Sequence, residues 1–317
     1  MGGGLCPFTA CLQSNHPQTL NPSCCMLSQE ELAALDHLIW LRSGQRAAAA
    51  IHCNQSTVSR RITRATALFG LTLEREAGEW QEVGPQLLLA LEREVHQLAR
   101  FLGEQPLRLE VAPYLAHLLA APPPPGWVCG PMDHVGILRP LDLLRSRVID
   151  AWLCDVGQDL HQLGEAAADL EVIPLFHFPV LLAALPSHPL VGCGRLGVED
   201  LRRFPLPALS PHAFPWAAPS RRAQGLGEEG RWPSHYTPAD WEGLCADGAS
   251  LSYATPFSRS LHPQLELLEA PPLLVNTGAL VCRAELAGQG AIQALHAMVC
   301  ARLRRLLPLL SQVEMRA

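Results

Sequence analysis

Three helical patterns follow one another between Ser28 and Gly70, and they constrain the fold more than any other feature of the 317-residue chain. Ser28 and Glu31 have the spacing of a capping box, after which apolar residues recur at helical spacing. A second, alanine-rich pattern covers 46–52, and after a short turn a third covers 55–69 and stops at Gly70. Helices joined by a tight turn in this arrangement predict a helix-turn-helix.

The charge of this segment differs from that of the whole chain. The chain has a formal net charge of −6, yet the stretch from Ser43 to Gly70 contains four arginines and no acidic residue. Small polar residues crowd the start of the third helix, where they can approach base edges, and arginines can reach phosphate or guanine. A solvated helix face with a polar N-terminus is the alternative. The candidate DNA-binding residues are Arg46, Gln55, Ser56, Thr57, Ser59, Arg60, Arg61 and Arg64.

Two further elements follow the third helix. Residues 74–83 contain Gly78 and predict a short hairpin, or wing, which is acidic and offers only Arg75 to DNA. Residues 85–102 predict a long amphipathic helix. Its apolar stripe is larger than one helix can bury on its own small domain, and this indicates a dimer. The stripe consists of Leu87, Leu88, Leu91, Val95, Leu98 and Leu102.

Beyond Pro106, short apolar runs alternate with helical stretches, which is typical of an α/β domain. The expected strands are 107–111, 127–129, 148–153, 170–174, 180–185, 206–209, 249–253, 265–269 and 273–282. The expected helices are 141–146, 241–246 and 291–307. Residues 211–240 are rich in Pro, Gly and Arg and predict no regular element.

A succession of motifs in this order resembles the LysR-type transcriptional regulators from about residue 32 to 307. The run AAAAIHCNQSTVSRRI is similar to the helix-turn-helix of that family, and WQEVG to the entry of its linker helix. In the second part, LLRSRVIDAWL, PLFHFPVLLAALPSHPLVG, VEDLRRFPL and ADGASLSYATP are similar to successive motifs of its sensor domain. The order and spacing of these motifs are more specific than any one of them.

The resemblance implies the fold class and the domains. The expected fold is α/β with an all-α winged helix-turn-helix head and a two-lobed, periplasmic-binding-protein-like (type 2) sensor domain. Its two crossover strands are expected near 155–157 and 255–257. The expected domains are a disordered leader over 1–27, with Met26 as an alternative start, a winged helix-turn-helix over 28–84, a linker helix over 85–106 and an effector-binding α/β domain over 107–310.

The resemblance also implies a sequence-specific, cytoplasmic regulator whose partners are double-stranded DNA, an unknown small-molecule effector and further copies of itself. A dimer is expected through the linker helix and a tetramer beyond it, with RNA polymerase as a further candidate partner. The family often has Ser or Thr at two places in the cleft, where hydroxyls can hold an anion. This chain has Pro113-Tyr114 at the first place and residues 134–136 at the second, so an anionic effector is less well supported. The candidate effector-binding residues are Pro113, Tyr114, Gly136, Asp155, Ser210 and Thr255.

Other functions find little support in the sequence. A solute-binding or interaction module with weakened DNA binding stays open because the wing is acidic. An enzyme is not expected, since no nucleophile–base constellation occurs, and the G-x-G-x-x-G at 225–230 follows no strand. No cofactor, metal site or membrane partner is expected. Three cysteines fall near the expected cleft: Cys129, Cys154 and Cys245. They are interpreted as small buried thiols, and a redox-sensing pair among them is the alternative.

Overall fold

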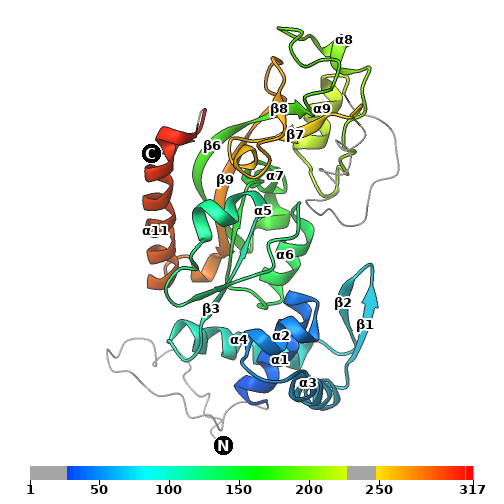
Figure 1. The fold of residues 1–317 in the computed structure, drawn as a ribbon. Helices are drawn as coiled ribbons and strands as arrows, with labels where there is room; N and C mark the ends of the chain where they lie inside the picture. The colour runs from blue at the N-terminus through cyan, green and yellow to red at the C-terminus, as the bar shows by residue number, and fades with distance from the viewer. Residues whose placement is uncertain (1–26, 227–247, 311, 317) are drawn as a thin grey trace, which may run out of the picture.

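A computed structural model describes residues 27–226, 248–310 and 312–316 of the chain. Its first part is a head of three helices and a two-stranded wing, followed by a fourth helix (Figure 1). The bounds are α1 Gln29–Leu41, α2 Gly44–Ala50, α3 Gln55–Phe69, β1 Thr72–Glu76, β2 Glu79–Val83 and α4 Leu87–Phe101. The predicted winged helix-turn-helix fold of the head is therefore confirmed.

Local capping explains why the helices of the head begin where they do. At α1 the Ser28 hydroxyl accepts a hydrogen bond from the Glu31 amide at 3.3 Å, and the Glu31 carboxylate accepts one from the Ser28 amide at 3.0 Å. Asn54 caps α3 through the Thr57 amide, and Gly70 ends the helix in the left-handed conformation. These signals lie within a few residues of each helix end, so the sequence alone reveals them.

The second part is built on a sheet in the order β10-β6-β9-β5-β3-β4. Strand β3 runs parallel to β4 and β5, whereas β9 runs antiparallel to β5 and β6. The strands are β3 Leu107–Val111, β4 Trp127–Cys129, β5 Ala151–Cys154, β6 Leu170–Ala184, β7 Ser252–Ala254, β8 Glu266–Leu267, β9 Leu274–Arg283 and β10 Glu314–Met315. The α-helices are α5 Pro113–Leu115, α6 Leu138–Arg145, α7 Gly157–Gln162, α8 Val198–Leu201, α9 Ala217–Ala223 and α11 Gly290–Leu306.

Two long strands join the two lobes of this part. The far end of β6 leaves the main sheet and pairs with β7 and β8, and a separate apolar core surrounds it there (Figure 1). Strand β9 accompanies β6 along ten residue pairs, so β6 and β9 are the crossing strands. The expectation that the crossings lie near 155–157 and 255–257 is wrong, because α7 starts at Gly157 and residues 255–257 lead into a short helical turn.

The remaining strand predictions differ from the structure in several places: β5 and β7 each begin three residues later than expected, and β10 was not expected. Residues 170–174 and 180–185 belong to one strand, since β6 continues past Pro174 with a register irregularity before Phe176. Residues 206–209 form no strand. The expected helix at 241–246 and the expected leader up to residue 26 lie outside the described residues, whereas Leu27 is buried. None of the described helices is long and apolar enough to span a bilayer.

Candidate DNA-reading helix and ligand cavity

The N-terminal end of α3 is exposed and held in place by its cap. The Asn54 carboxamide oxygen accepts hydrogen bonds from the Thr57 amide at 2.8 Å and the Ser56 hydroxyl at 2.7 Å. Gln55, Ser56 and Ser59 are exposed, and Thr57 is half-buried. In Figure 1, α3 lies on the side of the head away from the sensor domain. Its first turns are therefore open to a large partner.

The predicted arginines lie on α2 and α3 and have different neighbours. Arg60 donates a hydrogen bond to the Thr57 hydroxyl at 3.2 Å, and Arg61 is half-buried. Arg64 pairs with Glu31 at 3.1 Å while its side chain stays 78% exposed. Arg46 on α2 lies 3.6 Å from the carboxylate of Asp133 in the sensor domain. In the last two ion pairs the arginine side chains are exposed, at 78% for Arg64 and 59% for Arg46, so each arginine can exchange its carboxylate for a phosphate.

The acidic wing faces the sensor domain in part. Glu79 accepts hydrogen bonds from Arg42 and Arg139, both at 3.0 Å, and is largely shielded from solvent. Arg75 stays exposed with its guanidinium 5.6 Å from the Trp80 ring centroid. The carboxylate of Glu79 thus joins the head to the sensor domain, and its charge is balanced by arginines and does not repel DNA.

Buried ion pairs fasten the head to the rest of the chain. Asp36 on α1 is fully buried and accepts hydrogen bonds from Arg93 on α4 at 2.9 Å and Arg108 on β3 at 2.8 Å. Burial alone would raise the pKa of Asp36, but the two guanidiniums outweigh it and hold the pKa below its usual value. Burial lowers the pKa of Arg108 to about 10, so the arginine stays charged at neutral pH.

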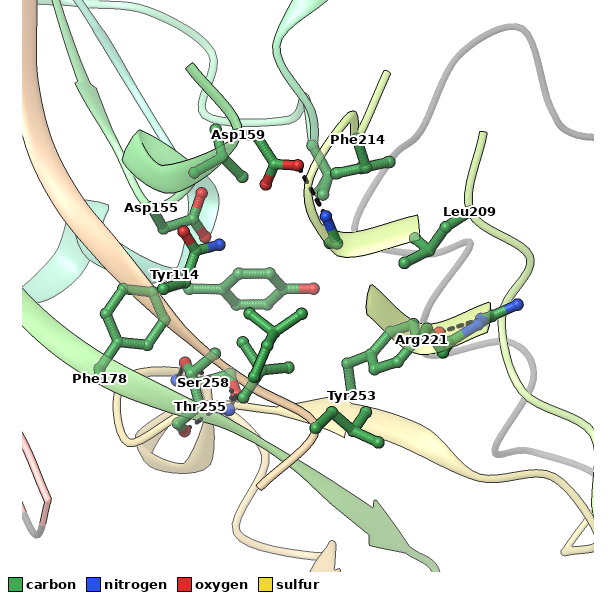
Figure 2. Close-up of a pocket in the computed structure, with 17 residues that line it drawn as sticks. Tyr114, Asp155, Asp159, Phe178, Leu209, Phe214, Arg221, Tyr253, Thr255 and Ser258 are labelled. Atoms are coloured by element: carbon green, nitrogen blue, oxygen red, sulfur yellow. Dashed lines mark hydrogen bonds between the residues drawn. The ribbon is translucent and has the colours of Figure 1, made fainter. Parts of the chain in front are cut away.

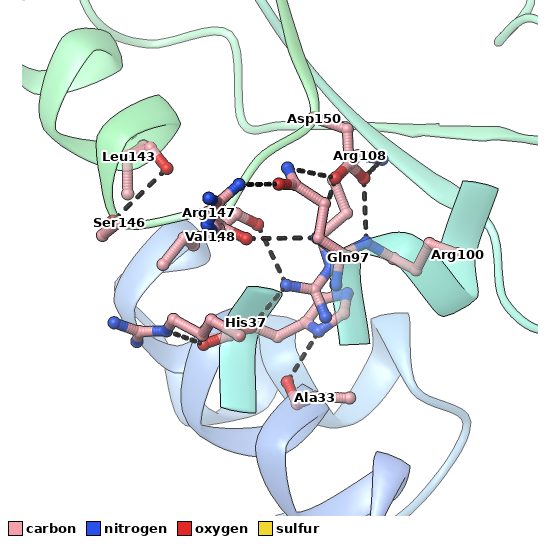
Figure 3. Close-up of polar contacts among 12 residues, drawn as sticks. Ala33, His37, Gln97, Arg100, Arg108, Leu143, Ser146, Arg147, Val148 and Asp150 are labelled. Carbon is pink, nitrogen blue, oxygen red and sulfur yellow. Dashed lines mark hydrogen bonds and ion pairs between the residues drawn. The ribbon is translucent and has the colours of Figure 1, made fainter. Parts of the chain in front are cut away.

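A second part of this network joins α4 to the sensor domain (Figure 3). Arg100 binds Asp150 through two hydrogen bonds of 2.9 and 2.7 Å, and Gln97 donates to the same carboxylate at 3.0 Å. The Arg108 amide also donates to Asp150 at 2.9 Å. Helix α4 therefore buries its polar face, and its apolar stripe is left outside.

The stripe of α4 is exposed along its whole length. The exposed fractions are 73% for Leu87, 49% for Leu88, 52% for Leu91, 41% for Val95, 47% for Leu98 and 66% for Leu102. A continuous apolar stripe of this kind marks an interaction surface. It matches the face for which the sequence predicted a dimer contact.

A cavity of about 100 Å³ lies between the two lobes of the sensor domain. Its walls come from α7, β6, β9, the segment that leads into α9, and the residues around β7 (Figure 2). Four aromatic side chains line it, together with several polar ones. The aromatic residues are Tyr114, Phe178, Phe214 and Tyr253, and the polar residues are Asp155, Asp159, Arg221, Thr255, Ser258 and Asn276.

The structure brings together three of the six candidate effector residues. Tyr114, Asp155 and Thr255 line the cavity. Pro113, Gly136 and Ser210 do not: Pro113 begins α5, and the Ser210 hydroxyl accepts the amides of residues 212 and 213. Gly136 packs beside the cavity, where a Cβ atom would lie 3.3 Å from the Phe214 ring.

Several lining residues escaped the sequence analysis. Phe214 and Arg221 lie in the stretch for which no element was predicted, and only the fold brings them to the cavity. Asp159 left no signal in the sequence either, because it lies on α7 while Asp155 precedes that helix, and only the fold places both at the cavity.

Cys129 and Cys154 lie in surroundings that disfavour a reactive thiolate. Burial raises the pKa of Cys129 to about 11 and that of Cys154 to about 12, which disfavours the reactive thiolate. Cys245 lies outside the described residues. Among the described residues, no three His, Cys, Asp or Glu side chains are grouped as a metal site requires.

Comparisons with known proteins place this fold. No protein-family model and no curated protein sequence matches the chain. Full-length OxyR from Pseudomonas aeruginosa is similar at 19% identity and a TM-score of 0.51, over 86% of this chain and 94% of that one. OxyR from Corynebacterium glutamicum bound to hydrogen peroxide is similar at 14% identity and a TM-score of 0.50, over 93% and 96%. CbnR, a LysR family transcriptional regulator, is similar at 15% identity and a TM-score of 0.50, over 88% and 99%. The chain therefore has the full-length fold of a LysR-type regulator, with a winged helix-turn-helix head and a two-lobed sensor domain.

Proposed function

We propose that the chain is a divergent LysR-type transcriptional regulator that binds double-stranded DNA through α3 and a small molecule through its sensor domain. The observation that carries the proposal is the exposed N-terminal end of α3. It combines small polar side chains with arginines, and α3 lies on the side of the head away from the sensor domain (Figure 1). Because the chain as a whole is acidic, this basic face is a local feature and not a general affinity for nucleic acid.

The exposed stripe of α4 supports self-association in this proposal. Two copies that bury their stripes against each other would hold two α3 helices at a fixed separation, as recognition of paired half-sites requires. The resemblance extends the dimer to a tetramer and adds RNA polymerase and a cytoplasmic location as expectations.

The loop between β4 and α6, residues 130–137, is suited to couple the cavity to the head. Asp133 pairs with Arg42 and Arg46 of the head, and Val135, two residues on, lines the cavity. Gly136 packs on Phe214, which is also a cavity residue. A ligand that moves Val135 or Phe214 would therefore shift Asp133, which pairs with Arg46. The ligand can change the position of this loop only if it binds the shifted and the unshifted arrangement with different affinities.

The second candidate function is a solute-binding module of the same architecture with weakened DNA binding. The pairing of Arg46 with Asp133 and of Arg64 with Glu31 favours it, since both pairs neutralise candidate phosphate contacts. A gel-shift titration of the full chain at low salt, with DNA upstream of its own gene and with a random duplex, separates the two. A regulator retards the upstream DNA at lower concentration than the random duplex, whereas the second function predicts no such preference.

A further inference from the structure

Two carboxylates lie together at one end of the sensor cavity (Figure 2). Asp159 is fully buried, and its Oδ1 accepts hydrogen bonds from the Trp216 amide at 2.8 Å and the Ala217 amide at 3.0 Å. Its other oxygen, Oδ2, accepts no hydrogen bond from any described residue. Asp155 precedes it by one helical turn and lines the same cavity. The carboxylate of Asp159 is thus fixed by the protein on one oxygen, whereas its other oxygen is buried and has no hydrogen-bond partner among the described residues.

Among the described residues, no cation is paired with these carboxylates, since neither Asp155 nor Asp159 forms an ion pair there. Arg221 lies on the opposite side of the cavity in Figure 2, where its guanidinium donates to the Pro207 carbonyl and the Tyr253 hydroxyl. Burial raises the pKa of Asp155 and of Asp159 to about 6, and Asn276 beside Asp159 offsets part of the rise. Burial therefore favours the protonated form of each acid, and a bound cation would favour the ionised form.

The rest of the cavity suits the body of an organic cation. Rings from Tyr114, Phe178, Phe214 and Tyr253 make up much of the wall, and aromatic faces attract cations. The hydroxyls of Thr255 and Ser258 are already hydrogen-bonded within their own turn. Mg²⁺ bound by one or two carboxylates keeps several waters, and a cavity of about 100 Å³ with aromatic walls is poorly suited to such a hydrated ion.

We propose that the effector of the sensor cavity is a small organic ammonium ion, whose N–H groups donate to Oδ2 of Asp159 and to Asp155 while its alkyl part packs on the aromatic wall. The inference rests on the proposed function only in taking this cavity as the sensor site. A cavity of about 100 Å³ is smaller than the roughly 150 Å³ that accommodates benzene. The ligand that fits this form of the cavity is therefore the size of a short alkylamine.

The test is calorimetric titration of the full chain at neutral pH with n-propylammonium and three comparison probes. n-Propanol has the same shape without charge, butyrate carries the opposite charge, and Mg²⁺ tests for a metal site. Such a small ligand binds weakly even when complementary, so the titration covers micromolar to millimolar concentrations. We expect n-propylammonium to bind with at least about tenfold higher affinity than each of the other three.

Variants locate the site. Asp159→Asn keeps the oxygen that accepts the Trp216 and Ala217 amides but removes the charge, and it should weaken n-propylammonium binding by about tenfold or more. Asp155→Asn should act in the same direction and serves as the second variant if the first does not fold. Asp142→Asn, an exposed carboxylate on α6 that does not line the cavity, should leave the affinity unchanged.

Tighter binding of butyrate, n-propanol or Mg²⁺, or no binding of n-propylammonium over the whole range, overturns the proposal. So does binding of n-propylammonium that both aspartate variants retain. The DNA titration separates this failure from that of the proposed function. Retention of specific DNA with no ammonium binding refutes the ligand class alone, and ammonium binding without any DNA preference refutes the regulator alone.

Discussion

Replacing Leu91 and Leu98 on α4 by Glu should dissociate the oligomer. These side chains are 52% and 47% exposed in a single copy, so about half of each remains to be buried by a partner. Complete burial of a leucine stabilises by about 1.5–3 kcal/mol, so each of the four leucines of a dimer contributes about 1 kcal/mol. Their loss alone is about 4 kcal/mol, or roughly a thousandfold in the dissociation constant, and unpaired buried carboxylates add to it.

Sedimentation velocity over a concentration series measures this change directly. The wild-type chain should sediment as a dimer or larger species and the double variant as a monomer, with an unchanged circular-dichroism spectrum because both side chains point away from the fold. Leu309→Glu is the matched control, since this leucine is 80% exposed but lies far from α4 in the sequence. A double variant that sediments like the wild type would refute the argument and place any interface elsewhere.

Three other perturbations test the head and the cavity. Asp36→Ala removes the carboxylate that Arg93 and Arg108 share. Arg93 keeps its pair with Glu82 at 2.7 Å, but Arg108 loses its carboxylate partner, so the free energy of unfolding should fall by about 3–5 kcal/mol in urea titrations; a loss below 1 kcal/mol would show that the pairs are dispensable. Asp133→Asn frees Arg46 and should raise the affinity for random DNA about two- to fivefold in gel shifts, and unchanged affinity would rule out competition between Asp133 and phosphate. For Asp159, whose pKa burial raises to about 6, the folded state takes up its proton more readily than the unfolded state, so wild-type stability should fall by about 2–3 kcal/mol as the pH rises from about 4 to above 6. Asp155, whose pKa burial also raises to about 6, adds a fall of its own to the wild-type profile. Asp159→Asn should therefore lessen the total fall by about 2–3 kcal/mol in chemical denaturation at a series of pH values, and an identical pH profile in the variant would contradict the assigned cause.

The sequence predicts the head well because its signals are local. Helix α1 begins after the capping box at Ser28, and α3 begins at Gln55 and ends before Gly70. Each of these signals depends only on neighbouring residues. The split of β6 at Pro174 was an error of the same local reasoning. A proline lacks an amide hydrogen, but the strand tolerates it where the register shifts.

The docking of the head could not be predicted from local patterns. Arg93 lies on the polar side of an amphipathic helix, which normally faces solvent, but its partner Asp36 is 57 positions away. The cavity could not be predicted from local patterns either. Asp159 and Phe214 are brought together only by the tertiary fold, in which β6 and β9 join the two lobes. Long-range ion pairs and shared cavities depend on the tertiary arrangement, which no short window of sequence contains.

The most direct test of DNA reading by α3 is the ratio of specific to random DNA affinity in the wild type, Thr57→Ala and Arg64→Ala. The specific duplex is one recovered by selection from a random library with the full chain, and titrations are run at low salt. Thr57→Ala should cost about 1–3 kcal/mol on the selected duplex and little on random DNA, so the ratio falls. Arg64→Ala should weaken both and reduce the salt slope by about one unit, so the ratio stays. If neither variant changes any DNA affinity, α3 does not read DNA and the account of this chain as a regulator is contradicted.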